Sequence, residues 1–574
     1  MKIDRRKFLV NSATLTALTS ILPTHLALAF EQEVSSNSLA KDPRRPQFHL
    51  LPARNWMNDP NGPIFWNGNY HMFFQYNPNA AVWGDMHWAH AISPDKLHWK
   101  HLPVALAPTP GGPDADGCFS GTAVVNKGVP TFIYTGVQKS SEEEATLRDG
   151  HNDFRETQLY ATSADPELKS WTKRPTPVIA KPPVGMQVTG FRDPSPWLQD
   201  GVWYMVVGSG IKDKGGVVLL YKSADLQTWE YQHILTSHDA KTGTKGTIAN
   251  PVDSGDMWEC PDFFQLGDKH VLIYSTQGKV FWETGDLDKK EMLFHPQQSG
   301  MLDYGSFYAP KTQLDKSGNR ILWGWIQETR PEAEFSTAGW AGLMSLPRIL
   351  TLGPDGRLKI TADSVVEKLR KHEQKLHFTP VAAVKPAPHP AAGNTAAAAS
   401  AESSKSAAAG QLLSSQRLKD ACGEILLNIH PSKEPFSIDL LTPGIPVAPA
   451  KAHADPAEAE DDPSADPQTP AGAIADQPSL ISIRYSQANA KELVVDQQRM
   501  PIDLTAGEPL ELRFYIDGSV IELFVNNQIT CTKRFYYPGQ TAPEIAVSFT
   551  GNPADVTRLS LWQLSPISKD RLTT

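Results

Sequence analysis

The sequence predicts an all-β protein: a five-bladed β-propeller over residues 46–350, followed by a β-sandwich domain over 377–570. Two observations predict the propeller. A hairpin with a glycine-containing turn recurs five times at intervals of 51 to 73 residues, and a second motif follows the first three hairpins. The sandwich is predicted by strand-like segments in the C-terminal part. A chain of 574 residues is also too long for one ordinary domain.

Residues 1–29 have the features of a twin-arginine signal peptide. Arg5 and Arg6 are adjacent, a mildly apolar stretch follows them, and the small-residue pattern Ala-Leu-Ala ends at Ala29. The alternatives are an ordinary secretory signal or a disordered basic start. No later run reaches the ~18 apolar residues of a membrane helix. We therefore expect export by the Tat machinery, cleavage after Ala29, and a mature protein in the periplasm or outside the cell, without membrane insertion.

Each of the five hairpins joins two apolar or aromatic strands through a turn with glycine. The hairpins span residues 63–76, 121–136, 196–210, 263–276 and 312–325. The second motif begins with Ser and ends at a Trp, as in "SADLQTW", and its copies end at Trp99, Trp171 and Trp229. It falls where the turn before an outer strand would lie. A sandwich could also supply many hairpins, but it would not explain this recurring outer motif.

After the predicted propeller, the sequence changes in character. Residues 351–376 are predicted to form a linker with a short helix over 364–376. Two Ala/Pro-rich stretches, 379–410 and 443–478, cannot bury a core and are predicted to be disordered insertions. The strands predicted for the sandwich lie at residues 424–430, 436–441, 480–486, 510–526 and 544–551.

Composition limits the class of partner. The formal net charge is -9 and 40% of the residues are hydrophobic. This balance argues against a broad basic face for nucleic acid and fits a neutral or polar small substrate. The chain has four cysteines, too few for a disulfide framework in an exported protein of this size, and no two of them have metal-site spacing. We expect no metal and no cofactor, and the oligomeric state is left open.

Three acidic residues occupy the same position in different hairpin repeats. Asp59, Asp193 and Glu259 lie eight or nine residues before the turn glycine of the first, third and fourth hairpins. In a propeller, the first strand of each blade lines the central channel, so acids at equal positions should converge at one mouth of that channel. A proline follows each acid by one or two residues, and apolar residues surround all three.

The structural alternative is that these acids belong to ordinary turns, because Asp-Pro is a common turn dipeptide. The same dipeptide also occurs in polar contexts at Asp42, Asp165, Asp455, Asp462 and Asp466. Three acids in register favour a functional site instead. Convergent carboxylates can form an oxygen-ligand metal site, although Ca²⁺ wants six to eight oxygens, or they can hydrolyse a glycoside with a nucleophile and an acid/base.

At these residues the sequence resembles glycoside hydrolase family 32, the β-fructofuranosidases (invertases, inulinases and levanases). The segments "WMNDPNG" (56–62), "FRDP" (191–194) and "WECPD" (258–262) are similar to the family's nucleophile, second-acid and acid/base motifs. Further similar segments are "QYNP" (75–78), "FSGTAV" (119–124), "DYGSFYAPK" (303–311) and "YIDGSVIELFVN" (515–526). The resemblance covers 46–350 in the family's order, together with the predicted sandwich. It departs from the family pattern at the two Ala/Pro-rich insertions.

The resemblance implies roles for matching positions. Asp59 would be the nucleophile, Glu259 the acid/base, and Asp193 a stabiliser of the transition state. Residues that would line the fructose subsite are Asn58, Gln75, Trp83, Phe119, Ser120 and Arg192. Weaker correspondences are Asp303, Tyr304 and Trp325; for Trp83 and Trp325, packing is an equally good explanation.

The resemblance implies an exported, retaining exo-hydrolase that releases terminal β-D-fructofuranosyl units from sucrose, levan or inulin. A retaining mechanism places the carboxyl groups of Asp59 and Glu259 about 5–5.5 Å apart. Two alternatives stay open: a fructosyltransferase with the same covalent intermediate, and a non-catalytic fructan-binding propeller. The sequence does not rank sucrose, levan and inulin.

Overall fold

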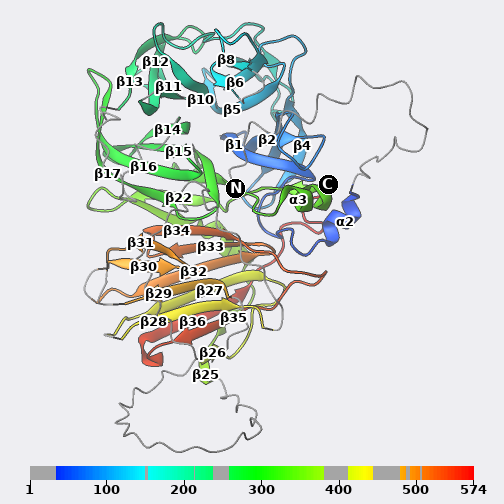
Figure 1. Ribbon diagram of the computed structural model, residues 1–574, viewed down its shortest axis with the longest axis vertical. Coiled ribbons are helices and arrows are strands. Elements are labelled where there is room, and N and C mark those ends of the chain that lie inside the picture. The colour runs from blue at the N-terminus through cyan, green and yellow to red at the C-terminus, as the bar shows by residue number, and fades with distance from the viewer. Residues whose placement is uncertain are drawn as a thin grey trace, which may run out of the picture.

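The computed structural model describes residues 34–148, 153–212, 214–236, 257–380, 412–432, 434–443, 479–486, 491–504 and 507–574. These residues form two β-rich parts, one above the other in Figure 1, with two short helices, α2 (Ser36–Lys41) and α3 (Glu332–Ala338), beside them. The predicted signal peptide lies outside the described residues, as do nearly all of the two Ala/Pro-rich insertions, so the predictions for these segments stay predictions.

Five antiparallel sheets, called sheets I to V here, follow one another along residues 55–362. Sheet I contains β1 (Asn55–Trp66), β2 (Asn69–Asn77), β3 (His87–Ser93) and β4 (Lys100–Leu106). Sheet II contains β5 (Gly117–Asn126), β6 (Val129–Lys139), β7 (Leu147–Arg148), β8 (Asp153–Thr162) and β9 (Thr172–Lys173). Sheet III contains β10 (Val188–Gln199), β11 (Val202–Ile211), β12 (Gly215–Ser223) and β13 (Glu230–Ile234). Sheet IV contains β14 (Glu259–Leu266), β15 (Lys269–Thr276), β16 (Lys279–Asp288) and β17 (Leu293–Asp303).

Sheet V completes the series and continues past the predicted boundary at residue 350. It contains β18 (Phe307–Leu314), β19 (Arg320–Ile326), β21 (Leu343–Met344), β22 (Arg348–Leu352) and β23 (Leu358–Ala362). Because β23 pairs with β22, the predicted linker over 351–376 is wrong in its first half, which forms the outer edge of this sheet. The helix expected over 364–376 is a 3-10 helix, η2 (Ser364–Leu369), and β24 (Gln374–Lys375) follows it.

The five predicted hairpins are confirmed as the pairs β1–β2, β5–β6, β10–β11, β14–β15 and β18–β19. Their turn glycines all have left-handed φ angles between 60° and 82°, which glycine adopts without strain. The outer motif also has the predicted place, since Trp99, Trp171 and Trp229 directly precede β4, β9 and β13. In the third copy, the Asp225 carboxylate accepts backbone hydrogen bonds from Gln227 and Thr228, which shapes the turn.

The first strands of the five sheets contact one another in a closed cycle. Each of β1, β5, β10, β14 and β18 contacts the next in this order, and β18 contacts β1. A further link closes the cycle, because β20 (Trp340–Ala341), in the connection between β19 and β21 of sheet V, pairs in parallel with β1. Lys96 of sheet I also pairs with Asp363, the residue after β23. The five first strands therefore form a closed ring of contacts.

The second part consists of two stacked antiparallel sheets, as predicted for a sandwich (Figure 1). One sheet has the order β24, β36 (Val556–Gln563), β27 (Cys422–Ile429), β32 (Leu510–Asp517), β33 (Val520–Val525) and β34 (Ile529–Arg534). The other has the order β25 (Phe378–Pro380), β26 (Leu412–Ser414), β35 (Ala546–Thr550), β28 (Phe436–Leu441), β29 (Ser479–Tyr485), β30 (Glu492–Val495) and β31 (Gln498–Pro501). The predicted segment 510–526 is the hairpin of β32 and β33, with its turn at Gly518 and Ser519.

A buried network of charged side chains joins the two parts. The His49 ring nitrogens lie 2.8 Å from Asp517 and 3.0 Å from Glu522, both of which belong to the sandwich. Arg348 of sheet V binds Glu522 at 2.6 Å and Asp303 at 2.8 Å, and all five side chains are fully buried. Charges buried this deeply are held by their partners, so separation of the two parts would leave them unpaired.

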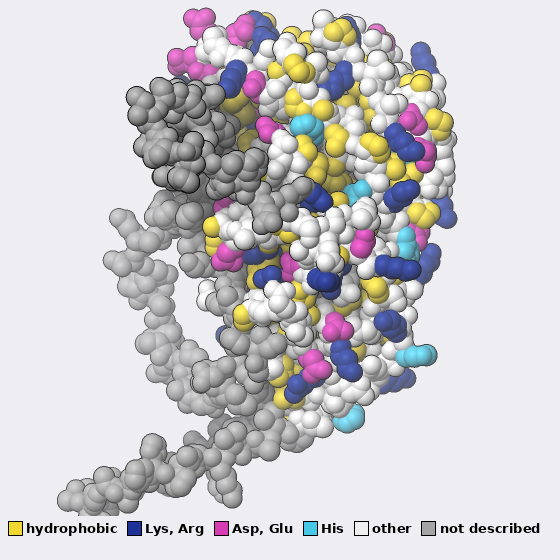
Figure 2. Space-filling view, turned by 90° about the vertical axis from the view of Figure 1, so that its right-hand side faces the viewer, with side chains coloured by type: hydrophobic (Ala, Val, Ile, Leu, Met, Phe, Trp, Pro, Cys, Tyr) yellow, Lys and Arg dark blue, Asp and Glu magenta, His cyan; other side chains and the backbone are white. Residues whose placement is uncertain are grey.

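All four cysteines are free and buried, in agreement with the prediction of no disulfide framework. Among the described residues, no helix has both the length and the apolar character required to cross a membrane. On the face of the molecule shown in Figure 2, Lys and Arg side chains are scattered among acidic and uncharged ones.

Candidate active site

The three predicted acids lie where the first strands of their sheets are bulged. In β1, β10 and β14, the pairing register with the second strand shifts between Met57 and Pro60, Arg192 and Ser195, and Glu259 and Asp262. Strands β5 and β18 have similar shifts at their corresponding points. Bulges re-aim side chains next to many active sites. The acids therefore lie within or at the first residue of these strands, at the point where the pairing is irregular.

Asp59 of β1 is held by a chain of side-chain hydrogen bonds. Ser120 donates to its Oδ2 at 2.6 Å, and Asn58 donates to its Oδ1 at 3.2 Å. Gln75 joins these two donors, because it accepts from Asn58 at 2.7 Å and donates to Ser120 at 2.7 Å. Trp56 fixes the other end of the chain through a 2.8 Å hydrogen bond from its Nε1 to Asn58. Three predicted subsite residues thus form one unit around the predicted nucleophile.

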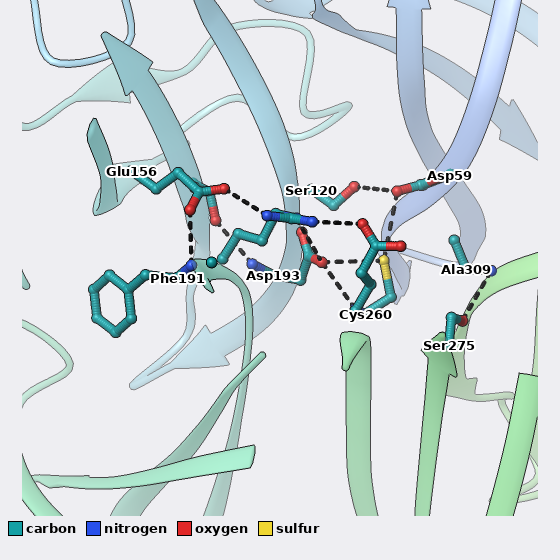
Figure 3. Close-up of polar contacts among 12 residues, drawn as sticks. Asp59, Ser120, Glu156, Phe191, Asp193, Cys260, Ser275 and Ala309 are labelled. Atoms are coloured by element: carbon teal, nitrogen blue, oxygen red, sulfur yellow. Dashed lines mark hydrogen bonds and ion pairs between the residues drawn. The ribbon is translucent and has the colours of Figure 1, made fainter. Parts of the chain in front are cut away.

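Asp193 of β10 is the most buried of the three acids. Its side chain accepts a 2.8 Å hydrogen bond from the backbone N–H of Cys260, and its own N–H donates to Thr135 at 2.9 Å. The Cys260 sulfur lies 3.5 Å from Oδ2 of Asp193 and 3.5 Å from Oδ2 of Asp59 (Figure 3). Cys260 therefore packs between the two aspartates.

Glu259, the first residue of β14, receives one hydrogen bond on each carboxylate oxygen. Arg192 donates to Oε1 at 2.6 Å, and the Tyr308 hydroxyl donates to Oε2 at 2.5 Å. The side chain of Glu259 is 15% exposed, whereas Asp193 is 3% exposed. Asp59 is also partly exposed. The two acids predicted to react with substrate are thus accessible to a ligand, and the predicted stabiliser lies beneath them.

Burial and mutual repulsion shift the pKa values of these acids. Burial raises the pKa of Asp193 to about 6, because the nearby Arg192 charge offsets desolvation and the charges of Asp59 and Glu259 only in part. Burial also raises the pKa of Asp59; the Ser120 hydrogen bond opposes this effect and the Glu259 charge adds to it. Burial is the main cause of both pKa shifts, and the charges of the neighbouring acids add to it.

An aromatic cluster lies beside Asn58 and Asp59. Trp56 makes an edge contact with Trp325, with ring centroids 5.8 Å apart, and Trp83 makes an edge contact with Phe119 at 5.9 Å. The two pairs belong to one apolar cluster, in which Trp83, Phe119 and Trp325 are only partly buried. The structure therefore brings these three predicted subsite residues to the same side of the site as Asp59.

Asp303 and Tyr304 are not part of this arrangement, so their predicted contact with substrate is not supported. The Asp303 carboxylate accepts hydrogen bonds from Arg348 at 2.8 Å and from the Thr532 hydroxyl at 2.7 Å. Tyr304 is 6% exposed and packs in an apolar core cluster with Trp258. Asp303 is the last residue of β17 and Tyr304 follows it, both at the contact with the sandwich, and this position explains their burial.

Three residues of the site were missed at the level of sequence. Glu156 of β8 is fully buried and accepts a 2.9 Å hydrogen bond from Arg192, Thr135 of β6 supports Asp193, and Tyr308 of β18 supports Glu259. Tyr308 belongs to the segment "DYGSFYAPK", which was a usable signal. Glu156 and Thr135 do not occupy the position, eight or nine residues before a turn glycine, that the three acids share. The repeat therefore gave no signal for them. Among the described residues, no group of three or more His, Cys, Asp or Glu side chains is placed to hold a metal ion.

Two partly exposed carboxyl groups beside a third, buried one fit the pair of acidic side chains that a glycoside hydrolase requires. Comparison with known proteins gives the family. The models of the glycosyl hydrolases family 32 N-terminal domain and of its C-terminal domain match residues 49–363 and 365–563. The chain belongs to glycosyl hydrolase family 32, and it is a β-fructofuranosidase.

Curated relatives and solved structures agree with this assignment. Raffinose invertase of Escherichia coli is 39% identical over 351 residues, which are 58% of this chain and 67% of that protein. A sucrose-6-phosphate hydrolase of Escherichia coli is 37% identical over 367 residues, or 60% and 70% of the two chains. The crystal structure of fructan 1-exohydrolase IIa from Cichorium intybus superimposes with a TM-score of 0.68 at 26% identity, over 91% of this chain and 98% of that one. A family 32 β-fructofuranosidase from Bombyx mori has the same fold, with a TM-score of 0.66 at 24% identity over 93% and 97% of the chains.

Proposed function

We propose that this protein is an exported, retaining hydrolase that releases terminal non-reducing β-D-fructofuranosyl units from sucrose, levan or inulin. The observation that carries the proposal is the convergence of Asp59, Asp193 and Glu259, in which Cys260 contacts both aspartates at 3.5 Å. We also propose that sheets I to V are the blades of a five-bladed propeller. Their first strands then line the channel, and the acids lie at one mouth of it.

In the first step of the proposed reaction, an Asp59 oxygen attacks the anomeric C2 of the fructosyl unit. The bond from C2 to the leaving oxygen breaks, and Glu259 donates its proton to that oxygen. In the second step Glu259 accepts a proton from water, the water oxygen bonds to C2, and the Asp59–C2 bond breaks. The positive charge that develops at C2 in both steps is stabilised by the nearby carboxylate of Asp193.

The neighbours of Asp59 are the proposed fructose subsite. Asn58, Gln75 and Ser120 hold the nucleophile, and their polar atoms face the same space as Asp59. Arg192 is 8% exposed and can bind a ring hydroxyl beside Glu259. Apolar contact with the sugar is assigned to the partly buried rings of Trp83, Phe119 and Trp325.

A panel of substrates tests the reaction type and the leaving group. We would incubate the mature protein with sucrose, sucrose 6-phosphate, inulin and levan at rising concentrations and analyse the products. Free fructose at all concentrations is the expected result. Oligosaccharides that grow with substrate concentration would identify a fructosyltransferase, and binding without any product would identify a fructan-binding protein.

Export by the Tat machinery is proposed on the pair Arg5 and Arg6 and on the cleavage pattern that ends at Ala29. We would express the full chain in bacteria with and without a functional twin-arginine translocase and follow activity outside the cytoplasm. Replacement of both arginines by lysine should abolish export and leave the cytoplasmic enzyme active. Export that persists without the translocase would point to the general secretory route.

A further inference from the structure

Glu156 lies outside the group of residues that can touch a substrate, yet it is bound to that group. It belongs to β8 of sheet II and is fully buried. Its Oε1 accepts a 2.9 Å hydrogen bond from Nη1 of Arg192. Its Oε2 accepts from the backbone N–H of Phe191 at 2.7 Å and from the Thr146 hydroxyl at 3.0 Å (Figure 3). Three donors on its two oxygens therefore hold this carboxylate in one orientation.

Arg192 stands between Glu156 and the proposed acid/base. Its Nη2 donates to Oε1 of Glu259 at 2.6 Å, while Nη1 is held by Glu156. The planar guanidinium is thus used as a fork, with a different carboxylate on each terminal nitrogen. Because Glu156 of sheet II holds Nη1 in place, it also fixes the direction in which Nη2 of Arg192 points toward Glu259.

The charge of Glu156 matters as much as its geometry. An arginine 2.6 Å from a carboxylate favours the ionised form of that carboxylate, whereas a general acid must carry its proton when the substrate binds. A second carboxylate on the same guanidinium offsets part of its charge. Within the described part of the chain, other titratable groups near Glu259 are the acids Asp59 and Asp193, the thiol of Cys260 and the Tyr308 hydroxyl. Lys311 also lies close by, since its Nζ binds the Pro261 carbonyl at 2.9 Å.

We propose that Glu156 is a positioning residue for the glycosidase reaction: it aims Arg192 at Glu259 and offsets its charge, so that the acid/base stays protonated to higher pH. The proposal rests on the proposed acid/base role of Glu259. It assigns no contact between Glu156 and substrate.

The test is the pH dependence of kcat/KM for sucrose, whose alkaline limb reports the loss of the acid's proton in the free enzyme. In Glu156→Gln, which has the same shape but no charge, the limb should move to lower pH by about one unit. In Glu156→Asp, which keeps the charge, the limb should stay nearer its original position. Glu144→Gln, a change at an exposed ion pair with Arg155, is the matched control and should leave the profile unchanged.

Two outcomes overturn the proposal in different ways. If Glu156→Gln lowers kcat/KM equally at every pH, its role is structural only. If the alkaline limb persists in Glu259→Gln, the acid/base assignment itself is wrong and the positioning role fails with it. Should Glu156→Gln not fold, Thr146→Val removes one donor from the Glu156 carboxylate and should shift the limb in the same direction by a smaller amount; an unshifted limb would then count against the proposal.

Discussion

The Tyr308 hydroxyl lies 2.5 Å from Oε2 of Glu259 and donates a hydrogen bond to it. The two residues come from neighbouring sheets, so the closed cycle of first strands is needed to bring them together. With Arg192 on the other oxygen, Glu259 is oriented from two sides, as a group that must deliver a proton along one direction has to be.

Glu259→Gln tests the role of this residue through the leaving group. Without a proton donor, hydrolysis of sucrose should slow by about 10²- to 10⁴-fold. A fructoside with an activated leaving group needs no protonation, so release of that leaving group in the first turnover should slow much less. Leaving-group release in the first turnover, measured on the two substrates, provides the comparison, and Asp165→Asn, in an outer turn of sheet II, is the control. Equal losses on both substrates would contradict the assignment.

Asp193→Asn should raise the free energy of unfolding and lower the activity. The pKa of Asp193 is raised to about 6 by burial, so the charged side chain costs folding energy above about pH 6, and this cost is absent below the ordinary aspartate pKa. Asparagine removes the charge and also tolerates the left-handed φ of 64° at this position. We expect the free energy of unfolding at pH 8 to rise by up to about 3 kcal/mol, with little change at pH 4. Denaturant unfolding at the two pH values measures this difference.

The same substitution should greatly lower kcat, because Asp193 no longer stabilises the charge that develops at C2. An Asp193→Asn variant with an unchanged kcat would show that the buried acid has only a structural role.

Asp303→Asn separates an inter-domain role from substrate binding. The change weakens the contact with Arg348, which is fully buried, so the free energy of unfolding should fall by about 3 kcal/mol. The KM for sucrose of the folded variant should not change. Asp200→Asn, at an exposed turn of sheet III, serves as the control for both measurements. A raised KM with normal stability would restore the original prediction that Asp303 binds substrate.

The contact between the two parts of the molecule should weaken at alkaline pH. Burial alone lowers the pKa of His49, but its hydrogen bonds to Asp517 and Glu522 outweigh this effect and raise the pKa to about 8. The resulting stabilisation is fully present below about pH 6.5 and is lost as the pH rises through about 8.

The stabilisation that protonated His49 provides is about 2 kcal/mol. Thermal unfolding between pH 6 and pH 9 should show this loss in the wild type. The loss should be absent in His49→Gln and retained in the exposed control His372→Gln. An identical pH dependence in all three proteins would rule out the His49 contribution.

The sequence predicts those features that are encoded locally. Each hairpin joins strands only a few residues apart, and its turn glycine has a left-handed φ, so the sequence indicates both the strands and their spacing. The equal positions of Asp59, Asp193 and Glu259 follow from the same repeat. The predicted end of the first domain at residue 350 falls inside sheet V. The pairing of β23 with β22 lies outside the repeated hairpin pattern, so the repeat did not reveal it.

Features that depend on contacts between sheets could not be predicted. Glu156 meets Arg192 only after sheets II and III pack side by side, and its strand lacks an acid at the repeated position. Asp303 is acidic and close to a family-like segment, which suggested a substrate contact. Its partners Arg348 and Thr532 lie 45 and 229 residues further along the chain, and only the packing of the sandwich brings them together.

The most direct test of the central claim is to trap the covalent intermediate. Glu259→Gln would be mixed with a fructoside that has an activated leaving group, so that the intermediate forms quickly and water attacks it slowly. The reaction is then quenched with acid, the protein is digested, and its peptides are mapped by mass spectrometry. The account predicts a fructosyl adduct on the peptide that contains Asp59 and at that side chain. An adduct on Asp193, or rapid turnover with no adduct on any peptide, would contradict it.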